Sequence, residues 1–214
     1  MIAILGRTAY DIKSILERDP AARNAFEVWL TYSGVHALSW HRVAYFLHVK
    51  AKLKLLARIV SQTCRFFTGI EIHPAAKIEG GVFIDHGMGV VIGETAEVHR
   101  GVVIYQGATL GGTGKDAGKR HPTLGDNVMV GAGAKVLGPF TIADNAKIAA
   151  NAVVLKEIPE NSTAVGMPAK VVRREGMRVE SDLDQIHIPD PVAQEIKRLE
   201  DRIAELEKQL GEKK

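Results

Sequence analysis

The chain has 214 residues, of which 46% are hydrophobic, 25% are charged and only 6% are aromatic, and its formal net charge is +3. These proportions are typical of a folded globular chain and exclude intrinsic disorder. No apolar run reaches the roughly 18 residues of a transmembrane helix, so no membrane association is expected. Glycine is frequent, with 21 residues. Frequent glycines and few aromatic rings predict a repetitive, tightly wound core.

A single cysteine, Cys64, cannot form an internal disulfide. The first residues also lack the basic segment and the cleavage site of a signal peptide. Both observations favour a reducing compartment, and we expect the protein to be cytoplasmic.

Residues 1–69 have the spacing of helices, because apolar residues such as Val35 and Leu38 recur at steps of three and four. We expect Asp19-Pro20 to begin one helix, as N-cap and first helical residue, and Gly69 to end the last. Most of the excess positive charge lies in this part. Since no base-stacking aromatic pattern accompanies it, we interpret it as a solvated helix face and expect no nucleic-acid partner.

Residues 70–172 contain an internal repeat of six. The repeat starts with an aliphatic residue and usually has a small residue four places later. Thirteen aliphatic positions keep this register: Ile72, Ile78, Ile84, Ile92, Val98, Ile104, Leu110, Leu124, Val130, Val136, Ile142, Ile148 and Val154. Such a hexapeptide repeat predicts a parallel β-helix of four to five triangular turns with the aliphatic residues inside. With the helices before it, the fold class is α+β.

Two interruptions of the register indicate where function lies. The step from Ile84 to Ile92 is longer by two residues, which fall around Asp85-His86-Gly87. The step from Leu110 to Leu124 leaves room for a loop that ends in Arg120-His121-Pro122. Long loops in a tight solenoid are usually functional.

Residues 173–214 form a tail with a heptad pattern over 191–210, at Val192, Ile196, Leu199, Ile203, Leu206 and Leu210. This pattern predicts a helix that either packs on the body of its own chain or, as our hypothesis, helps three chains to associate.

Histidines are the candidate chemical groups, and two of them coincide with the interruptions. No close histidine pair flanks the loop, so we expect no metal site. A histidine can instead take a proton from an alcohol when a carboxylate orients its ring. Glu71 precedes His86 by nearly one turn of about 18 residues, so the two side chains are able to lie on neighbouring turns within reach of each other.

The motifs resemble those of the serine O-acetyltransferase family of hexapeptide-repeat acyltransferases, in its short form. The resemblance covers about 150 residues and rests on these runs: Asp19-Pro20, Glu71–Ile78, Ile84–Gly87, Val91–Thr95, Thr109–Lys115, Arg120–Pro122, Gly131–Lys135 and Gly166–Lys170. The Asp-His and Arg-His-Pro elements are specific to that family, whereas Gly166–Lys170 indicates only the superfamily. The resemblance also implies a left-handed β-helix.

The resemblance implies transfer of the acetyl group of acetyl-CoA to the hydroxyl of L-serine, the first step from serine to cysteine. His86 is then the general base and Glu71 its orienting carboxylate, although many family members have aspartate at that position. Asp19 and Asp85 are expected to bind the ammonium of serine, and Arg120 and His121 its carboxylate. The expected contacts to CoA are at Gly112, Ala132 and Ala150.

The resemblance also implies partners. We expect a homotrimer with the active site between neighbouring subunits, and inhibition by L-cysteine in the serine site. The chain ends Gly211–Lys214, without the terminal isoleucine by which longer members bind O-acetylserine sulfhydrylase, so we do not expect that complex.

Two other functions remain open at this point. The same histidine would serve an acetyltransferase acting on a hydroxyl of a sugar or a xenobiotic. A solenoid without catalytic activity would be a scaffold. Both would make the charged groups expected around serine unnecessary.

Overall fold

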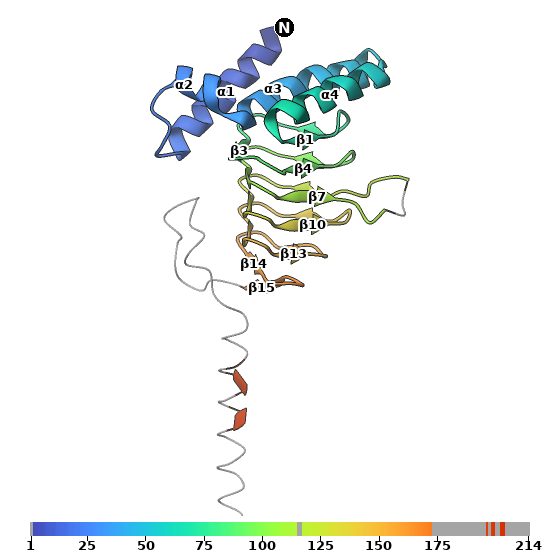
Figure 1. Cartoon of the computed structure of the whole chain (residues 1–214). Helices are drawn as coiled ribbons and strands as arrows, with labels where there is room; N and C mark the ends of the chain where they lie inside the picture. The colour runs from blue at the N-terminus through green and yellow to red at the C-terminus, as the bar shows by residue number, and fades with distance from the viewer. Residues whose placement is uncertain (1, 115–116, 173–195, 197, 200–201, 204–214) are drawn as a thin grey trace, which may run out of the picture.

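The computed structural model describes residues 2–114 and 117–172, and in the tail residues 196, 198, 199, 202 and 203. Helices form the first third of the chain, and a column of short strands follows (Figure 1). The helices are α1 (Ile2–Arg18), α2 (Ala25–Thr31), α3 (Ser33–Tyr45) and α4 (Lys54–Thr68), and the π-helical turn η1 (Phe46–Lys50) follows α3. Within the described residues, no helix is both long enough and apolar enough to cross a bilayer.

Local sequence signals set the ends of these helices. The side chain of Asn24 accepts the N–H of Glu27 at 2.9 Å and caps α2. Gly69 ends α4 as predicted, with the left-handed φ of 71° that glycine adopts without steric cost. The prediction that Asp19-Pro20 begins a helix is wrong, because α1 ends at Arg18. The Asp19 carboxylate accepts the N–H of Ala21 at 2.8 Å instead, and forms the turn before α2.

The strands form three sheets, and the chain visits them in the order A, B, C in successive turns, except that the last turn meets sheet B only through an isolated bridge between Ile142 and Ile158. Sheet A contains β1 (Glu71–Ile72), β4 (Val91–Ile92), β7 (Thr109–Gly111), β10 (Lys135–Leu137) and β13 (Val153–Val154). Sheet B contains β2 (Lys77–Ile78), β5 (Glu97–Val98), β8 (Thr123–Leu124) and β11 (Thr141–Ile142). Sheet C contains β3 (Phe83–Asp85), β6 (Val103–Tyr105), β9 (Met129–Val130), β12 (Lys147–Ile148), β14 (Thr163–Val165) and β15 (Lys170–Val172). These strands confirm the predicted parallel β-solenoid, and β15 alone among them pairs antiparallel, with β14.

The predicted six-residue register is the register of the core. Ile92 pairs with Ile72 on one side and with Leu110 on the other, so equivalent repeat positions lie directly above one another. Of the thirteen aliphatic residues only Ile78, on the first turn, is partly exposed. Each fully buried aliphatic side chain contributes about 1.5–3 kcal/mol to stability, so the stacked rows hold the turns together.

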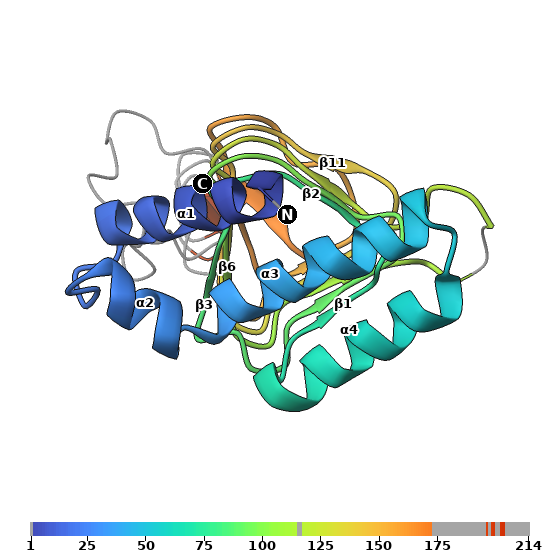
Figure 2. The ribbon, with the colours of Figure 1, turned by 90° about the horizontal axis from the view of Figure 1, so that it is seen from above.

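Two edges of the column matter for function. The turns from sheet C to sheet A form one of them, which we call the C–A edge, and the turns from sheet A to sheet B form the A–B edge. They lie on opposite sides of sheet A, as the view along the column shows (Figure 2). β3 ends at the C–A edge, and the loop over 112–122 leaves the column at the A–B edge (Figure 1).

The helices are attached to the first turn by close contacts. At Gly34 an added Cβ would lie 2.2 Å from the carbonyl oxygen of Ile84, so only glycine lets α3 approach β3 this closely. The buried carboxylate of Asp11 accepts the N–H of Gly81 at 2.8 Å and pairs with Arg42 on α3. These contacts place the end of α1 and the start of α3 beside the last residues of β3.

The predicted boundaries and tail can be placed on this fold. The boundary at residues 69–70 falls between α4 and β1, and the boundary at 172–173 falls directly after β15. In the predicted heptad helix over 191–210, the five described residues are helical, and Ile196, Leu199 and Ile203 are exposed. The rest of that segment lies outside the described residues.

We expect acid to destabilise the protein through His41, a buried residue whose Nε2 lies 3.1 Å from the carbonyl oxygen of Ala76. Burial lowers the pKa of His41 from 6.5 to about 4. The unfolded chain therefore binds this proton at higher pH, and the stability present above pH 6.5 is lost as the pH falls towards 4, by about 3 kcal/mol. Urea unfolding of His41→Gln at several pH values should show a flatter dependence of the unfolding free energy on pH over this range than the unmodified chain shows.

Candidate active site

A small cavity lies where α1, α3 and β3 meet. Its volume is about 420 Å³, and Asp19, Tyr32, Asp85 and His86 line it. Asp85 ends β3, and His86 begins the C–A edge turn with a left-handed φ of 56°. This conformation is uncommon for a residue with a side chain. The Ser33 hydroxyl donates to the carbonyl oxygen of His86 at 3.1 Å and helps to hold this turn.

Asp19 reaches this cavity because the end of α1 is fixed on the solenoid. The Arg18 guanidinium donates to the carbonyl oxygen of Gly101 at 2.5 Å. The Tyr32 hydroxyl then donates to the free carboxylate oxygen of Asp19 at 2.6 Å. Burial, followed by the hydrogen bond to Asp19, raises the pKa of Tyr32 to about 12. The tyrosine therefore remains a donor and keeps Asp19 pointed into the cavity.

The cavity is poised for a cation. Burial raises the pKa of Asp85; His86 opposes this shift, and the nearby Asp19 adds to it. Two carboxylates that face one small cavity repel each other, and a positively charged group bound between them would relieve the repulsion. A primary ammonium has three donors, which suits such a pair.

Glu71 lies on β1, in sheet A, and is bound by arginines of α4. Its carboxylate lies 2.9 Å from Arg65 and 3.5 Å from Arg58. The contacts of the described chain connect Glu71 with these arginines and not with His86. That Glu71 orients His86 stays a prediction.

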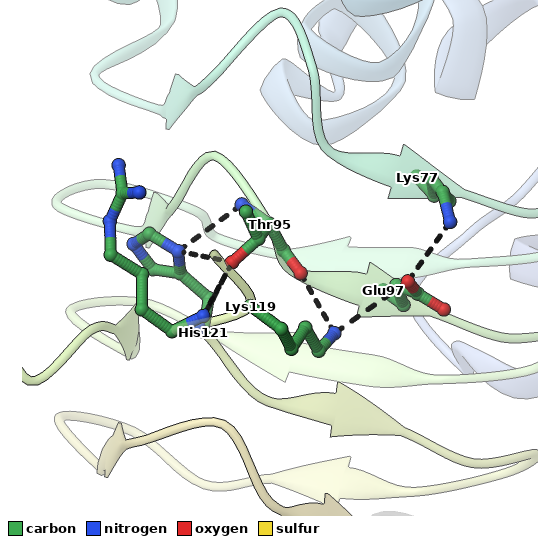
Figure 3. A network of polar contacts seen from close by, with 6 residues as sticks. Lys77, Thr95, Glu97, Lys119 and His121 are labelled. Atoms are coloured by element: carbon green, nitrogen blue, oxygen red, sulfur yellow. Dashed lines mark hydrogen bonds and ion pairs between the residues drawn. The ribbon is translucent and has the colours of Figure 1, made fainter. Parts of the chain in front are cut away.

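The other predicted site residues, Arg120 and His121, lie at the A–B edge, where Figure 3 shows His121 beside Thr95. Arg120 and His121 end the loop, and the guanidinium of Arg120 pairs with the Glu94 carboxylate. Hydrogen bonding to Arg120 lowers the pKa of Glu94. The ring of His121 covers Gly93, where an added Cβ would lie 2.1 Å from Nε2, so glycine is required there. Burial, and then the charge of Arg120, lowers the pKa of His121.

The predicted CoA contacts divide between the two edges. Gly112 lies at the A–B edge, where an added Cβ would be 3.1 Å from the side chain of Arg120. Ala132 lies at the C–A edge, and its carbonyl oxygen accepts the N–H of Asn151 in the next turn at 2.8 Å. Ala150 lies one turn further along the same edge. Ala132 and Ala150 thus share an edge with His86, and Gly112 shares one with Arg120 and His121.

Sequence reasoning missed three residues that shape these groups. Glu94 and Thr95 contact Arg120 and His121 from the preceding turn of the A–B edge. The register contained a usable signal for both, since they occupy the corner directly above the end of the loop. Tyr32 had no such signal, because its contact with Asp19 depends on how α1 and α3 pack. Among the described residues, no three side chains of the metal-binding types gather into a site.

Comparisons with known proteins agree with this geometry. Residues 121–156 match the family model described as bacterial transferase hexapeptide (six repeats). The chain is 53% identical to a serine acetyltransferase of Bacillus subtilis (strain 168) over 95% of its own length and 94% of the relative's. It is 54% identical to a serine acetyltransferase of Staphylococcus aureus (strain MSSA476), over 92% and 91%.

Solved structures give the same result. A serine acetyltransferase in complex with cysteine has a TM-score of 0.82 at 40% identity, covering 87% of this chain and 72% of that one. A serine acetyltransferase in complex with CoA has a TM-score of 0.76 at 41% identity, covering 79% and 70%. The Neisseria gonorrhoeae serine acetyltransferase in complex with serine has a TM-score of 0.76 at 41% identity, covering 80% and 69%.

Proposed function

The chain belongs to the serine acetyltransferase family, and we propose that His86 is the general base of its reaction. The activity is transfer of the acetyl group from acetyl-CoA to serine, for cysteine biosynthesis. The observation that carries this function is the identity of 53% to the Bacillus subtilis enzyme over nearly the whole chain. The roles of individual residues below are our proposal.

In the proposed mechanism, the imidazole of His86 takes the proton of the serine hydroxyl as its oxygen attacks the thioester carbonyl. The tetrahedral intermediate then expels the CoA thiolate, which receives the same proton from the imidazolium. Asp19 and Asp85 bind the serine ammonium, and Tyr32 holds Asp19 in place. The raised pKa of Asp85 and the cavity between these carboxylates support the assignment of the cation site.

The serine carboxylate would be bound by Arg120 and His121, a pairing favoured by charge and hydrogen bonding. These residues lie at the opposite edge of sheet A from His86, and one serine molecule is too small to contact both edges of one chain. We therefore propose a homotrimer in which the C–A edge of one subunit meets the A–B edge of the next. Each active site then takes its base and its carboxylate-binding groups from different chains.

The same arrangement accounts for the other expected ligands. Acetyl-CoA would lie along the joined edges, where Ala132 and Ala150 of one chain face Gly112 of its neighbour. L-cysteine carries the same ammonium and carboxylate as serine, so it would bind in the serine site and inhibit. The related structures in complex with cysteine, serine and CoA support these assignments. We propose a cytoplasmic location, in keeping with the single cysteine.

The function can be tested by measuring CoA thiol release from acetyl-CoA with candidate acceptors. We expect release with L-serine and little with galactosides, because only serine has the charged groups that both edges bind. Faster release with a sugar would favour the alternative hydroxyl acetyltransferase. Binding of acetyl-CoA without release for any acceptor would favour the scaffold.

A further inference from the structure

Thr95 is the centre of the polar network at the A–B edge, and it contacts the end of the loop through three of its groups (Figure 3). Its hydroxyl oxygen accepts the backbone N–H of Arg120 at 3.0 Å and that of His121 at 3.1 Å. Its carbonyl oxygen accepts the Lys119 ammonium at 2.8 Å. Lys119 and Lys77 both pair with Glu97, which ties this network to sheet B. Residues 119–121 are therefore attached to one threonine of the preceding turn.

Thr95 also contacts the ring of His121. Its backbone N–H donates to Nδ1 at 3.1 Å, and its hydroxyl oxygen lies 2.9 Å from the same nitrogen. A backbone N–H is always a donor, so this contact favours Nδ1 as the acceptor. The hydroxyl oxygen already accepts two N–H groups, which leaves its own proton free to donate to Nδ1. A proton on Nδ1 would instead face a second donor at close range.

We propose that Thr95 is a positioning residue that holds His121 as the neutral tautomer with its proton on Nε2. The ring then presents Nε2–H as a donor, which suits a carboxylate acceptor such as that of serine. Burial, which lowers the pKa of His121, favours the same neutral form. The link from this tautomer to serine binding rests on the proposed function of His121, whereas the tautomer itself does not.

The first test therefore measures the tautomer without substrate. Ring nitrogen–proton correlation spectra of ¹⁵N-histidine-labelled protein, with His121→Asn to assign the signal, should show His121 with its proton on Nε2 at neutral pH. In Thr95→Val the spectra should show a mixture of tautomers, because Nδ1 keeps only the backbone donor. A proton on Nδ1 in the unmodified protein would overturn the proposal, whatever His121 binds.

The second test measures kinetics. In Thr95→Val we expect the KM for serine to rise about 5- to 100-fold, because two backbone N–H groups lose their acceptor and Nδ1 loses one of its two donors. The kcat and the KM for acetyl-CoA should change little, since His86 lies at the other edge. Thr95→Ser keeps the hydroxyl and should restore the KM, and Thr141→Val, the same change at an exposed position on sheet B, should have no effect.

The two tests separate the possible failures. In Thr95→Val, kcat, the kcat/KM for serine, the kcat/KM for acetyl-CoA and the melting temperature could all fall together. That result would show that Thr95 is only structural, and would overturn the proposal. If the tautomer shifts in Thr95→Val but the serine KM does not, the positioning role in catalysis is wrong. The assignment of His121 to the serine carboxylate then fails with it, while general-base catalysis by His86 is unaffected.

Discussion

Replacing His86 by alanine is expected to lower the kcat for serine acetylation by about 10²- to 10⁴-fold, the usual contribution of a general base. The serine hydroxyl then has no group in the cavity that can accept its proton, because Asp19 and Asp85 are directed at the ammonium. Binding of acetyl-CoA should persist, since its proposed contacts lie on later turns. The measurement is steady-state CoA release together with acetyl-CoA binding by calorimetry.

The matched control is His99→Ala. His99 lies in a turn from sheet B to sheet C, with its side chain 42% exposed and 4.0 Å from Asp126. Like His86 it is a histidine of the solenoid, but it lies at neither edge of sheet A. Its removal should leave kcat within about twofold, as expected for a surface substitution. An equal loss in both variants would contradict the assignment of His86 as the base.

The solenoid was predictable from sequence because its physics is local and repeated. The chain needs an aliphatic residue inside and a small residue at the corner once every six positions. One position that departs from this pattern therefore does not change the register that the other repeats indicate. The two interruptions marked His86 and the loop with Arg120 for the same reason. A deviation is visible only against a regular register.

The helical part and the finer contacts were not predictable in the same way. Asp19 forms the turn before α2 and is held by Tyr32, a contact that depends on how two helices pack and on the close approach at Gly34. A single aspartate followed by proline fits a helix start equally well in sequence. Glu71 was ambiguous in a similar way. Its spacing to His86 allows a contact between the two side chains, but does not indicate that Glu71 pairs with arginines of α4.

The arrangement of the site between subunits leads to a second prediction with a large effect. His86→Ala and Arg120→Ala chains are each expected to be nearly inactive at low serine concentration, because the first lacks the base and the second lacks a charged hydrogen bond to the carboxylate. Mixed trimers of the two should recover activity. When equal amounts of the two chains assemble at random, each contact between two subunits forms one active site. That site has an intact His86 from one chain and an intact Arg120 from its neighbour with a probability of about one quarter, so about a quarter of the unmodified activity should return.

The control for this experiment places both substitutions on one chain and mixes it with the unmodified chain. A site shared between subunits again gives about a quarter of the full activity, because both neighbours must contribute an intact edge. A site built within each chain would give about one half here and no recovery in the first mixture. The pair of mixtures, prepared by co-expression with two affinity tags and checked for trimers by sedimentation, therefore decides which edges meet. Recovery near zero in the first mixture together with one half in the second would show that one chain holds the complete site.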